Sequence, residues 1–132
     1  MRFVIPGRLS GLNEMVNANR TNPYKGAKLK KDNERIVMDA LRYQRVQPVY
    51  EPVYLRFMWV EPNKRRDKDN IASAHKYILD ALVKMGILEN DGWKQILGFS
   101  DRFAVDPKNP HIVVEILTEA EAEERQARFV EI

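Results

Sequence analysis

The sequence predicts a single α+β domain, in which one small mixed sheet of about four strands packs with two main helices plus a C-terminal helix. Two observations lead to this prediction. The chain has 132 residues, enough for one hydrophobic core but marginal for two. Stretches with apolar residues at alternate positions also interleave with stretches at helical spacing, in the order strand, helix, strand, helix, strand, strand, helix.

The first elements are a short strand and a long polar segment. Residues 2–5 form the predicted strand, which ends at Pro6. Residues 11–31 are rich in asparagine and contain Pro23 and Gly26, so this segment is predicted to be a loop. A loop of about 20 residues is long for so small a domain and is more often functional or mobile than passive. We expect its basic side chains either to contact a phosphate backbone or to be simply solvated.

A helix and a strand follow. Residues 32–44 are predicted to be helical because their apolar residues form one stripe, namely Ile36, Val37, Ala40 and Leu41. Residues 53–60 are predicted to form a strand because alternate positions are apolar, namely Val53, Leu55, Phe57 and Trp59. Trp59 could stack on a nucleic-acid base, but its alignment with three other apolar residues favours a position in the core.

The second half contains a further helix and two strands. The helix is predicted to begin at Asp69 or Asn70, because both residue types cap helix N-termini, and to end at Gly86. Residues 96–99 and 112–117 are short apolar runs and are predicted to be strands. These two runs bring the sheet to about four strands.

The C-terminal segment differs from the rest of the chain in its charge. Thr118 followed by Glu121 resembles a capping box, which predicts a last helix that reaches about residue 128. Its exposed positions are mostly acidic, so we expect it to be solvated or to face a partner. The chain is therefore divided into a main domain, residues 1–118, and an acidic C-terminal helix or tail, residues 119–132.

The composition argues against several classes of function. There is no cysteine, which excludes a disulfide framework, a thiolate zinc site and a cysteine nucleophile. With only two histidines, a histidine-rich metal site is not expected. No apolar run approaches the roughly 20 residues that a membrane helix needs, and the N-terminal apolar run is too short for a signal peptide. We expect a cytoplasmic protein with no membrane partner and no organic cofactor.

The most informative residues are three aspartates near basic side chains. Asp67 and Asp69 lie two residues apart at the start of the predicted helix, and Asp91 follows that helix. Neighbouring carboxylates repel one another, and a divalent cation between them removes the repulsion. Each aspartate also has an ordinary explanation, as a helix cap, as the partner of a neighbouring arginine, or as the start of a glycine turn. The fold must bring all three together before they can share a metal ion.

Basic residues surround the first two aspartates and would attract a polyanion. The net charge is only +3, but basic residues dominate up to Lys68, so the main domain is more basic than the total indicates. We predict contacts to the DNA backbone from five side chains: Lys64, Arg65, Arg66, Lys68 and, in the polar segment, Arg20.

Helix geometry separates two further candidates. Lys76 lies on the same helix face as Asp69, about 10 Å along the axis, and its side chain leans back toward the helix start. It could therefore meet a phosphate or stabilise charge on a leaving oxygen. Asp80 is some 16 Å from Asp69, too far to share a metal ion with it. Asp80 is more readily explained as an ion-pair partner of Lys76, and this pair is the alternative to a catalytic role for Lys76.

These residues closely resemble the RusA family of Holliday junction resolvases, small endonucleases that are common in prophages. The resemblance covers about residues 2–118, which would make the main domain a RusA-like endonuclease domain. Its motifs are residues 65–70 (Arg-Arg-Asp-Lys-Asp-Asn), Lys76 with residues 80–82, Gly86, and residues 90–93. The ordered set is specific, whereas a lone Asp-Lys-Asp-Asn would be a weak signal.

The resemblance implies a homodimer that binds four-way DNA junctions and nicks two strands symmetrically, with Mg²⁺ or with Mn²⁺ as a substitute. By motif position it implies that Asp67, Asp69 and Asp91 are metal ligands and catalytic residues. It also implies that Lys76 is the catalytic lysine and that Arg66 is a DNA contact.

The chain departs from the family pattern at two places. In some members the lysine falls where this chain has Ser73, whereas alignment from the other end of the helix recovers Lys76. Members often have two adjacent aspartates where this chain has Asn90 before Asp91. Two other functions fit the same residues, a non-catalytic DNA-binding recombination accessory protein and a less selective flap or single-strand nuclease. A candidate for the dimer interface is the apolar pair at residues 129–130.

Overall fold

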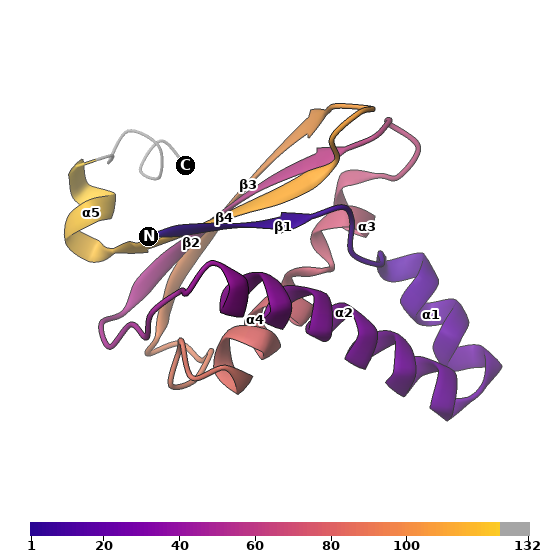
Figure 1. Cartoon of the computed structure of the whole chain (residues 1–132), viewed down its shortest axis with the longest axis horizontal. Helices are drawn as coiled ribbons and strands as arrows, with labels where there is room; N and C mark the ends of the chain where they lie inside the picture. Colours follow the sequence, from indigo (N-terminus) through magenta and orange to yellow (C-terminus); the bar gives the residue numbers. More distant parts are fainter. Residues whose placement is uncertain (125–132) are drawn as a thin grey trace.

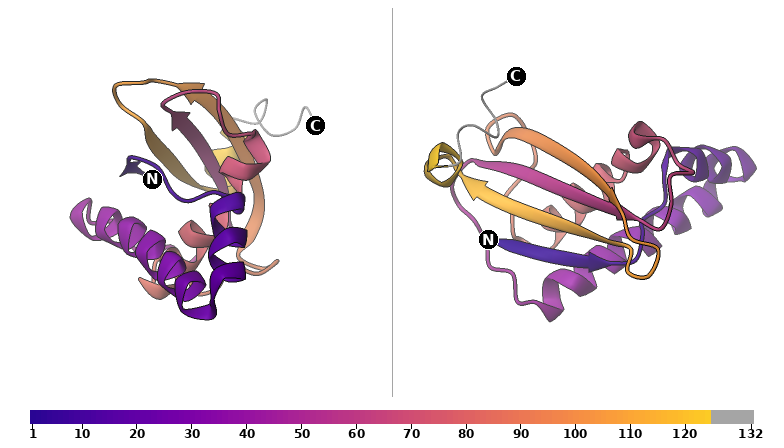
Figure 2. Two further views of the ribbon diagram at one scale, coloured as in Figure 1. Left: turned by 90° about the vertical axis from the view of Figure 1, so that its right-hand side faces the viewer. Right: turned by 90° about the horizontal axis from the view of Figure 1, so that it is seen from above.

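The computed structural model describes residues 1–124 and shows an α+β domain with one four-stranded sheet (Figure 1). The predicted fold class is confirmed. The strands are β1 (Arg2–Pro6), β2 (Val53–Glu61), β3 (Ile96–Val105) and β4 (His111–Thr118). The helices are α1 (Leu12–Thr21), α2 (Pro23–Tyr43), α3 (Lys68–Ala72), α4 (His75–Lys84) and α5 (Glu119–Glu124). The helices α2 and α4 lie across one face of the sheet, and the other face is in front in the right-hand view of Figure 2.

The strand order is β1-β4-β2-β3, with β2 and β3 parallel and the other two pairs antiparallel. In the parallel pair Val53 lies beside Ile96 and Glu61 lies beside Val105. A strand rises about 3.3 Å per residue, so these two ends of the pair are roughly 25 Å apart. Residues just before Ile96 therefore lie at one end of the sheet, and residues just after Glu61 lie at the other.

The core forms between the sheet and the helices, as the alternation in β2 predicts. Trp59 is 1% exposed and belongs to this core, so its predicted burial is confirmed. The same face of the sheet carries Phe3, Ile5, Leu55, Phe57, Ile112 and Val114, all buried. The helices contribute Val37, Leu41, Ile78 and Leu82 to the same cluster.

The prediction of a loop at residues 11–31 is wrong, because α1 and the first part of α2 occupy this segment. The residues that suggested a loop instead begin a helix. Asn22 is the N-cap of α2, where its side-chain oxygen accepts a hydrogen bond from the backbone N–H of Lys25 at 2.8 Å. Pro23 occupies the first helical turn, where its missing N–H removes no hydrogen bond.

Two glycines in the same region allow close packing. A Cβ atom at Gly26 would lie 1.8 Å from the side-chain oxygen of Asn19, so a larger residue there would have to displace the Asn19 side chain from its place between α1 and α2. At Gly11, a Cβ atom would lie 2.5 Å from the side-chain oxygen of Asn70. That oxygen accepts a hydrogen bond from the backbone N–H of Asn13 at 3.1 Å and so caps the start of α1. Asn70, from the aspartate-rich motif, thereby ties α1 to α3.

The second predicted helix is divided. It forms α3 and α4, with a break around Ser73, whose hydroxyl donates to the carbonyl oxygen of Asn70 at 2.7 Å. At the C-terminal end, the predicted capping box is confirmed, because Thr118 Oγ1 accepts from the N–H of Glu121 and donates to the Glu121 carboxylate at 3.0 Å. The predicted end of this helix and residues 129–130 lie outside the described residues. None of the helices within residues 1–124 combines the length and the apolar character needed to cross a membrane.

Candidate metal and nucleic-acid site

A buried ion pair fixes the segment that joins β2 to α3. The carboxylate of Glu61 accepts hydrogen bonds from Arg66 Nε at 3.0 Å and Nη2 at 2.9 Å. Arg8 Nη2 donates to the same carboxylate at 3.1 Å, and Arg66 Nη1 donates to the carbonyl oxygen of Leu9 at 3.0 Å. The Arg66 and Glu61 side chains are only 12% and 6% exposed. Arg66 therefore holds the segment in place from the inside, through the two-pronged geometry that strengthens an arginine–carboxylate pair.

Asp67 and Asp69 stand where this segment enters α3. Asp67 is the N-cap residue, but its side chain makes no capping hydrogen bond, and Asp69 lies in the first turn. Both side chains are exposed, and neither carboxylate forms a hydrogen bond or an ion pair with another residue between 1 and 124. Neither aspartate thus caps the helix or pairs with an arginine, which were the ordinary explanations of these residues. All four carboxylate oxygens remain available to a ligand.

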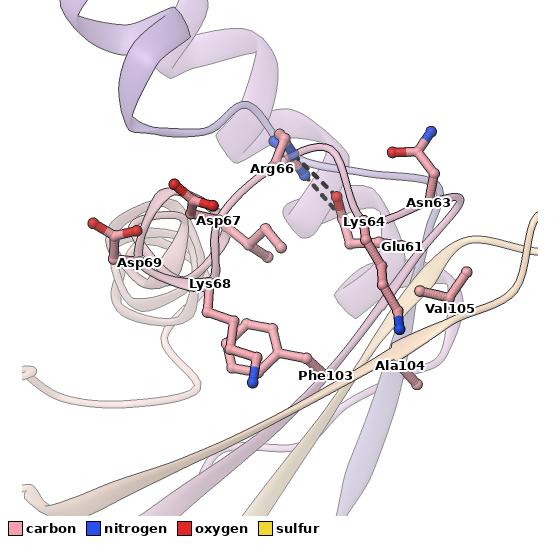
Figure 3. Close-up of a pocket in the computed structure, with 11 residues that line it drawn as sticks. Glu61, Asn63, Lys64, Arg66, Asp67, Lys68, Asp69, Phe103, Ala104 and Val105 are labelled. Carbon is pink, nitrogen blue, oxygen red and sulfur yellow. Dashed lines mark hydrogen bonds and ion pairs between the residues drawn. The ribbon is translucent and has the colours of Figure 1, made fainter.

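A pocket of about 780 Å³ opens between this segment and the end of β3 (Figure 3). It is lined by residues from the range 61–71 and by residues 103–105. In Figure 3 the carboxylates of Asp67 and Asp69 point to one side of the chain, and Lys68 extends to the other side, toward β3. Asp67 and Asp69, the acidic pair, therefore lie at the rim of the pocket. Lysine and apolar side chains line the interior of the pocket.

The β3 wall of this pocket lies beyond the predicted strand, which ends at residue 99. Phe103 is partly buried against the core, and Lys68 Nζ lies 5.7 Å from the centre of its ring. The signal that indicates a longer strand is the apolar residue at every second position, at Phe99, Phe103 and Val105. Asp101 interrupts this alternation and hides it.

Three of the five predicted DNA contacts are available beside the acidic pair. Lys64, Arg65 and Lys68 are exposed, and none of them forms an ion pair within the described part of the chain. Arg66 is occupied by Glu61, so its guanidinium has a structural partner. Arg20 is exposed in the last turn of α1, the end of that helix farther from α3. DNA binding by these residues stays a prediction.

Asp91 does not join Asp67 and Asp69 within one chain. The segment before β3 lies beside the start of β2, where the carbonyl oxygen of Gln95 accepts from the N–H of Val53 at 2.8 Å. Asp67 and Asp69 follow the end of β2, at the opposite end of the sheet. Accordingly, residues 1–124 contain no group of three or more His, Asp or Glu side chains that could hold a metal ion. A metal site that includes Asp91 together with Asp67 and Asp69 stays a prediction.

Lys76 forms an ion pair with Asp80, which was the alternative to a catalytic role in the sequence analysis. Its Nζ is 3.1 Å from Asp80 Oδ1. The hydrogen bond to Asp80 and the charge of Asp80 raise the pKa of Lys76 above its usual value of 10.5, and Asp91 and Glu34 add smaller contributions. Lys76 is therefore protonated at neutral pH, when it can supply positive charge but cannot act as a base. A catalytic role for Lys76 stays a prediction.

A chain of ion pairs continues from Asp80 between α4 and α2. Lys30 lies 3.5 Å from Asp80 Oδ2 and 3.9 Å from Glu34 Oε2. Glu34 has a side chain only 1% exposed and also pairs with Lys84. Lys30, which sequence analysis assigned to a basic loop, thus joins two helices instead.

His75 connects α4 to the sheet. Its Nε2 lies 2.7 Å from Asp101 Oδ1, which also accepts a hydrogen bond from Trp59 Nε1 at 2.7 Å. The imidazole stacks on the ring of Phe99, with 5.2 Å between the ring centroids, and its centroid lies 4.3 Å from that of the Phe57 ring. These contacts account for His75 as a packing residue.

A comparison of the chain with models of known protein families finds no match, and a comparison with curated protein sequences finds none either.

Proposed function

We propose that this protein is a divalent-metal-dependent endonuclease that resolves branched DNA, with four-way junctions as its substrate. The observation that supports this most directly is the pair of unpartnered carboxylates, Asp67 and Asp69, at the rim of a pocket that unpaired lysines also line. The motif resemblance to the RusA family supports the same reaction and substrate. Two available carboxylates at one pocket are a ligand set that a divalent cation can use.

The residues present fit Mg²⁺ or Mn²⁺. Both are hard cations that prefer oxygen ligands, and Mg²⁺ is commonly held by one or two carboxylates together with substrate phosphates and water. Asp67 and Asp69 would supply the carboxylates. When bound, such an ion supplies an activated water for attack on phosphorus and neutralises charge on the leaving oxygen.

The remaining side chains of the site position the substrate. Lys64, Arg65 and Lys68 bind backbone phosphates and so place the scissile phosphate at the acidic pair. The Glu61–Arg66 pair keeps their segment rigid, which preserves that alignment. The proposal assigns the metal to Asp67 and Asp69, because both line the same pocket and neither has a partner within residues 1–124. The contribution of Asp91 is tested by Asp91→Asn, and that of the Lys76–Asp80 pair by Asp80→Asn.

The proposal includes a homodimer. A four-way junction has approximate two-fold symmetry, so a symmetric dimer presents two equivalent sites to the two strands that must be cut. Paired nicks at symmetric positions are the product that such an arrangement makes.

Single-turnover cleavage of a synthetic mobile four-way junction tests the proposal, beside linear duplex and flap substrates, with Mg²⁺ and with EDTA. We expect paired symmetric nicks on the junction alone, abolished by EDTA and by Asp69→Asn. The matched control is Asp39→Asn, which removes the same charge from the exposed surface of α2 and should cut at the wild-type rate.

Two results would contradict the proposal. Tight junction binding without cleavage under either Mg²⁺ or Mn²⁺ would indicate a non-catalytic recombination accessory protein. Equal cleavage of flaps and junctions would indicate a less selective nuclease.

A further inference from the structure

We infer that the pocket beside the acidic pair binds one unstacked nucleotide of the DNA, with the base on the ring of Phe103 and the phosphate at Lys64 and Lys68. This inference rests on the proposed function, because it names what the same site holds next to the cut. It also adds a residue, Phe103, that the motif does not contain.

The position of Phe103 suits a stacking surface. β3 is the last strand in the sheet order, so the pocket opens at the edge of the sheet. Phe103 pairs with Trp59 in the parallel register and packs against the core, which holds its ring in one orientation. The ring also lines the pocket, where Ile71, Ala104 and Val105 extend the apolar wall. A rigid aromatic ring in an apolar wall is the surface on which proteins stack unpaired bases.

The size of the pocket limits what can enter. Its volume of about 780 Å³ lies within the range of roughly 300–1,000 Å³ that is typical of sites for small organic molecules. A base can reach such a pocket only after it has left the helical stack. Bases at the crossover of a branched DNA lose part of their stacking, so they enter at lower cost than bases in a linear duplex.

The charges of the pocket make nucleotide binding depend on the metal. Glu61 and Arg66 neutralise each other, which leaves Lys64 and Lys68 to balance Asp67 and Asp69. A divalent cation at the aspartates would leave the lining with a net charge of about +2, and that charge attracts a phosphate. Metal and nucleotide therefore favour each other's binding.

Lys68 connects the two parts of the site. Its ammonium group lies 5.7 Å from the centre of the Phe103 ring, a cation–π distance. Both Lys64 and Lys68 extend toward β3 in Figure 3. When a base occupies the ring, the Lys68 ammonium is displaced from it and is left free to bind the phosphate of the same nucleotide.

The test combines a protein variant with a DNA variant. Dissociation constants of the full chain are measured by fluorescence anisotropy with immobile four-way junctions in Ca²⁺, and gels verify that the DNA stays intact. Each nucleotide that flanks the crossover is replaced in turn by an abasic analogue. Phe103→Leu should weaken binding of the intact junction by about tenfold. It should change binding by less than about twofold when the abasic analogue is at the captured position, because no base remains to stack.

The matched control is Phe99→Leu, which changes an exposed ring on the same face of β3 but outside the pocket. It should bind like the wild type. Phe103→Trp keeps an aromatic ring and should bind as tightly as the wild type. Thermal melting of each variant verifies that it is folded. When EDTA replaces Ca²⁺, the dissociation constants of Phe103→Leu and the wild type should become more similar. Without the cation, the pocket attracts the phosphate of the nucleotide less strongly.

The results separate this inference from the proposed function. If Phe103→Leu weakens binding equally with and without the base at every position, the inference is overturned. The proposed function is not affected by that result, because it is tested separately by cleavage of the junction. If the base-dependent loss is observed but no DNA is cut in Mg²⁺, the inference stands and the proposed function is overturned. A protein that binds none of the junctions overturns both.

Discussion

The two charged regions of this molecule differ in how their charges are satisfied. Between α2 and α4, lysines and carboxylates alternate in one chain of ion pairs: Lys76, Asp80, Lys30, Glu34 and Lys84. Around the start of α3, Asp67, Asp69, Lys64 and Lys68 form no ion pair with any residue of the range 1–124. The two regions contain the same residue types, and the sequence alone does not tell them apart.

The difference shows which charges hold the fold and which remain for a ligand. Paired charges at a helix interface help to hold the two helices together, because each side chain has a partner of opposite charge on its own or the other helix. Asp67 and Asp69 are exposed and have no partner within residues 1–124, so both carboxylates remain available to a ligand. Two neighbouring arginines differ in the same way. Arg66 is paired with Glu61, whereas Arg65 is exposed.

The largest effect is expected at the unpaired aspartates. Asp69→Asn should reduce single-turnover junction cleavage on the order of a thousandfold, because it removes a charged metal ligand. Asp80→Asn removes a carboxylate from the paired region and should leave the rate within about threefold. If both variants lost the same amount of cleavage activity, the ion pairs would not mark which carboxylates take part in cleavage.

A large effect on stability is expected at the buried arginine. Arg66→Ala leaves the Glu61 carboxylate buried without its main partner and should lower the free energy of unfolding by about 3–5 kcal/mol. Arg65→Ala changes an exposed side chain and should lower it by less than about 0.5 kcal/mol. Urea denaturation measures both. If Arg66→Ala keeps full stability and only weakens junction binding, Arg66 is the DNA contact that the motif implies.

A smaller effect is expected at Asp91. The segment that follows Asp91 lies beside the start of β2, whereas the acidic pair follows the end of β2. Asp91→Asn should therefore slow cleavage by less than about fivefold. A loss as large as that of Asp69→Asn would show that Asp91 reaches the metal from a second copy of the chain.

The smallest effect is a change in a single pKa. Asp80 raises the pKa of Lys76 above 10.5 through a hydrogen bond and its charge, so Asp80→Asn should lower it. The pair stabilises the fold below the unfolded pKa of Lys76, and this contribution is lost as the pH rises through the folded value. Neutral pH lies far below this window. NMR titration of the Lys76 side chain measures the change, and an unaltered pKa would show that the pair does not persist in solution.

The sequence predicted the elements whose signals are local. The alternation in β2, the burial of Trp59 and the capping box at Thr118 depend only on residues close together along the chain. The segment 11–31 was predicted wrongly because asparagine, proline and glycine have two uses. Here they cap helices and allow close packing, and the partners that reveal this use include Asn70, more than 50 positions away in the chain.

By itself the sequence determined the fold class and the place of Asp67 and Asp69 at the start of a helix. Only the tertiary structure decided which charges are paired, because Arg66 finds Glu61 and Lys30 finds Asp80 through the packing of separate elements. It also decided the distances between motifs. Asp91 is separated from the other aspartates by the parallel register of β2 and β3, and Phe103 is brought to them by the same register. Strand register is set by the whole hydrophobic face of the sheet, so no single motif contains it.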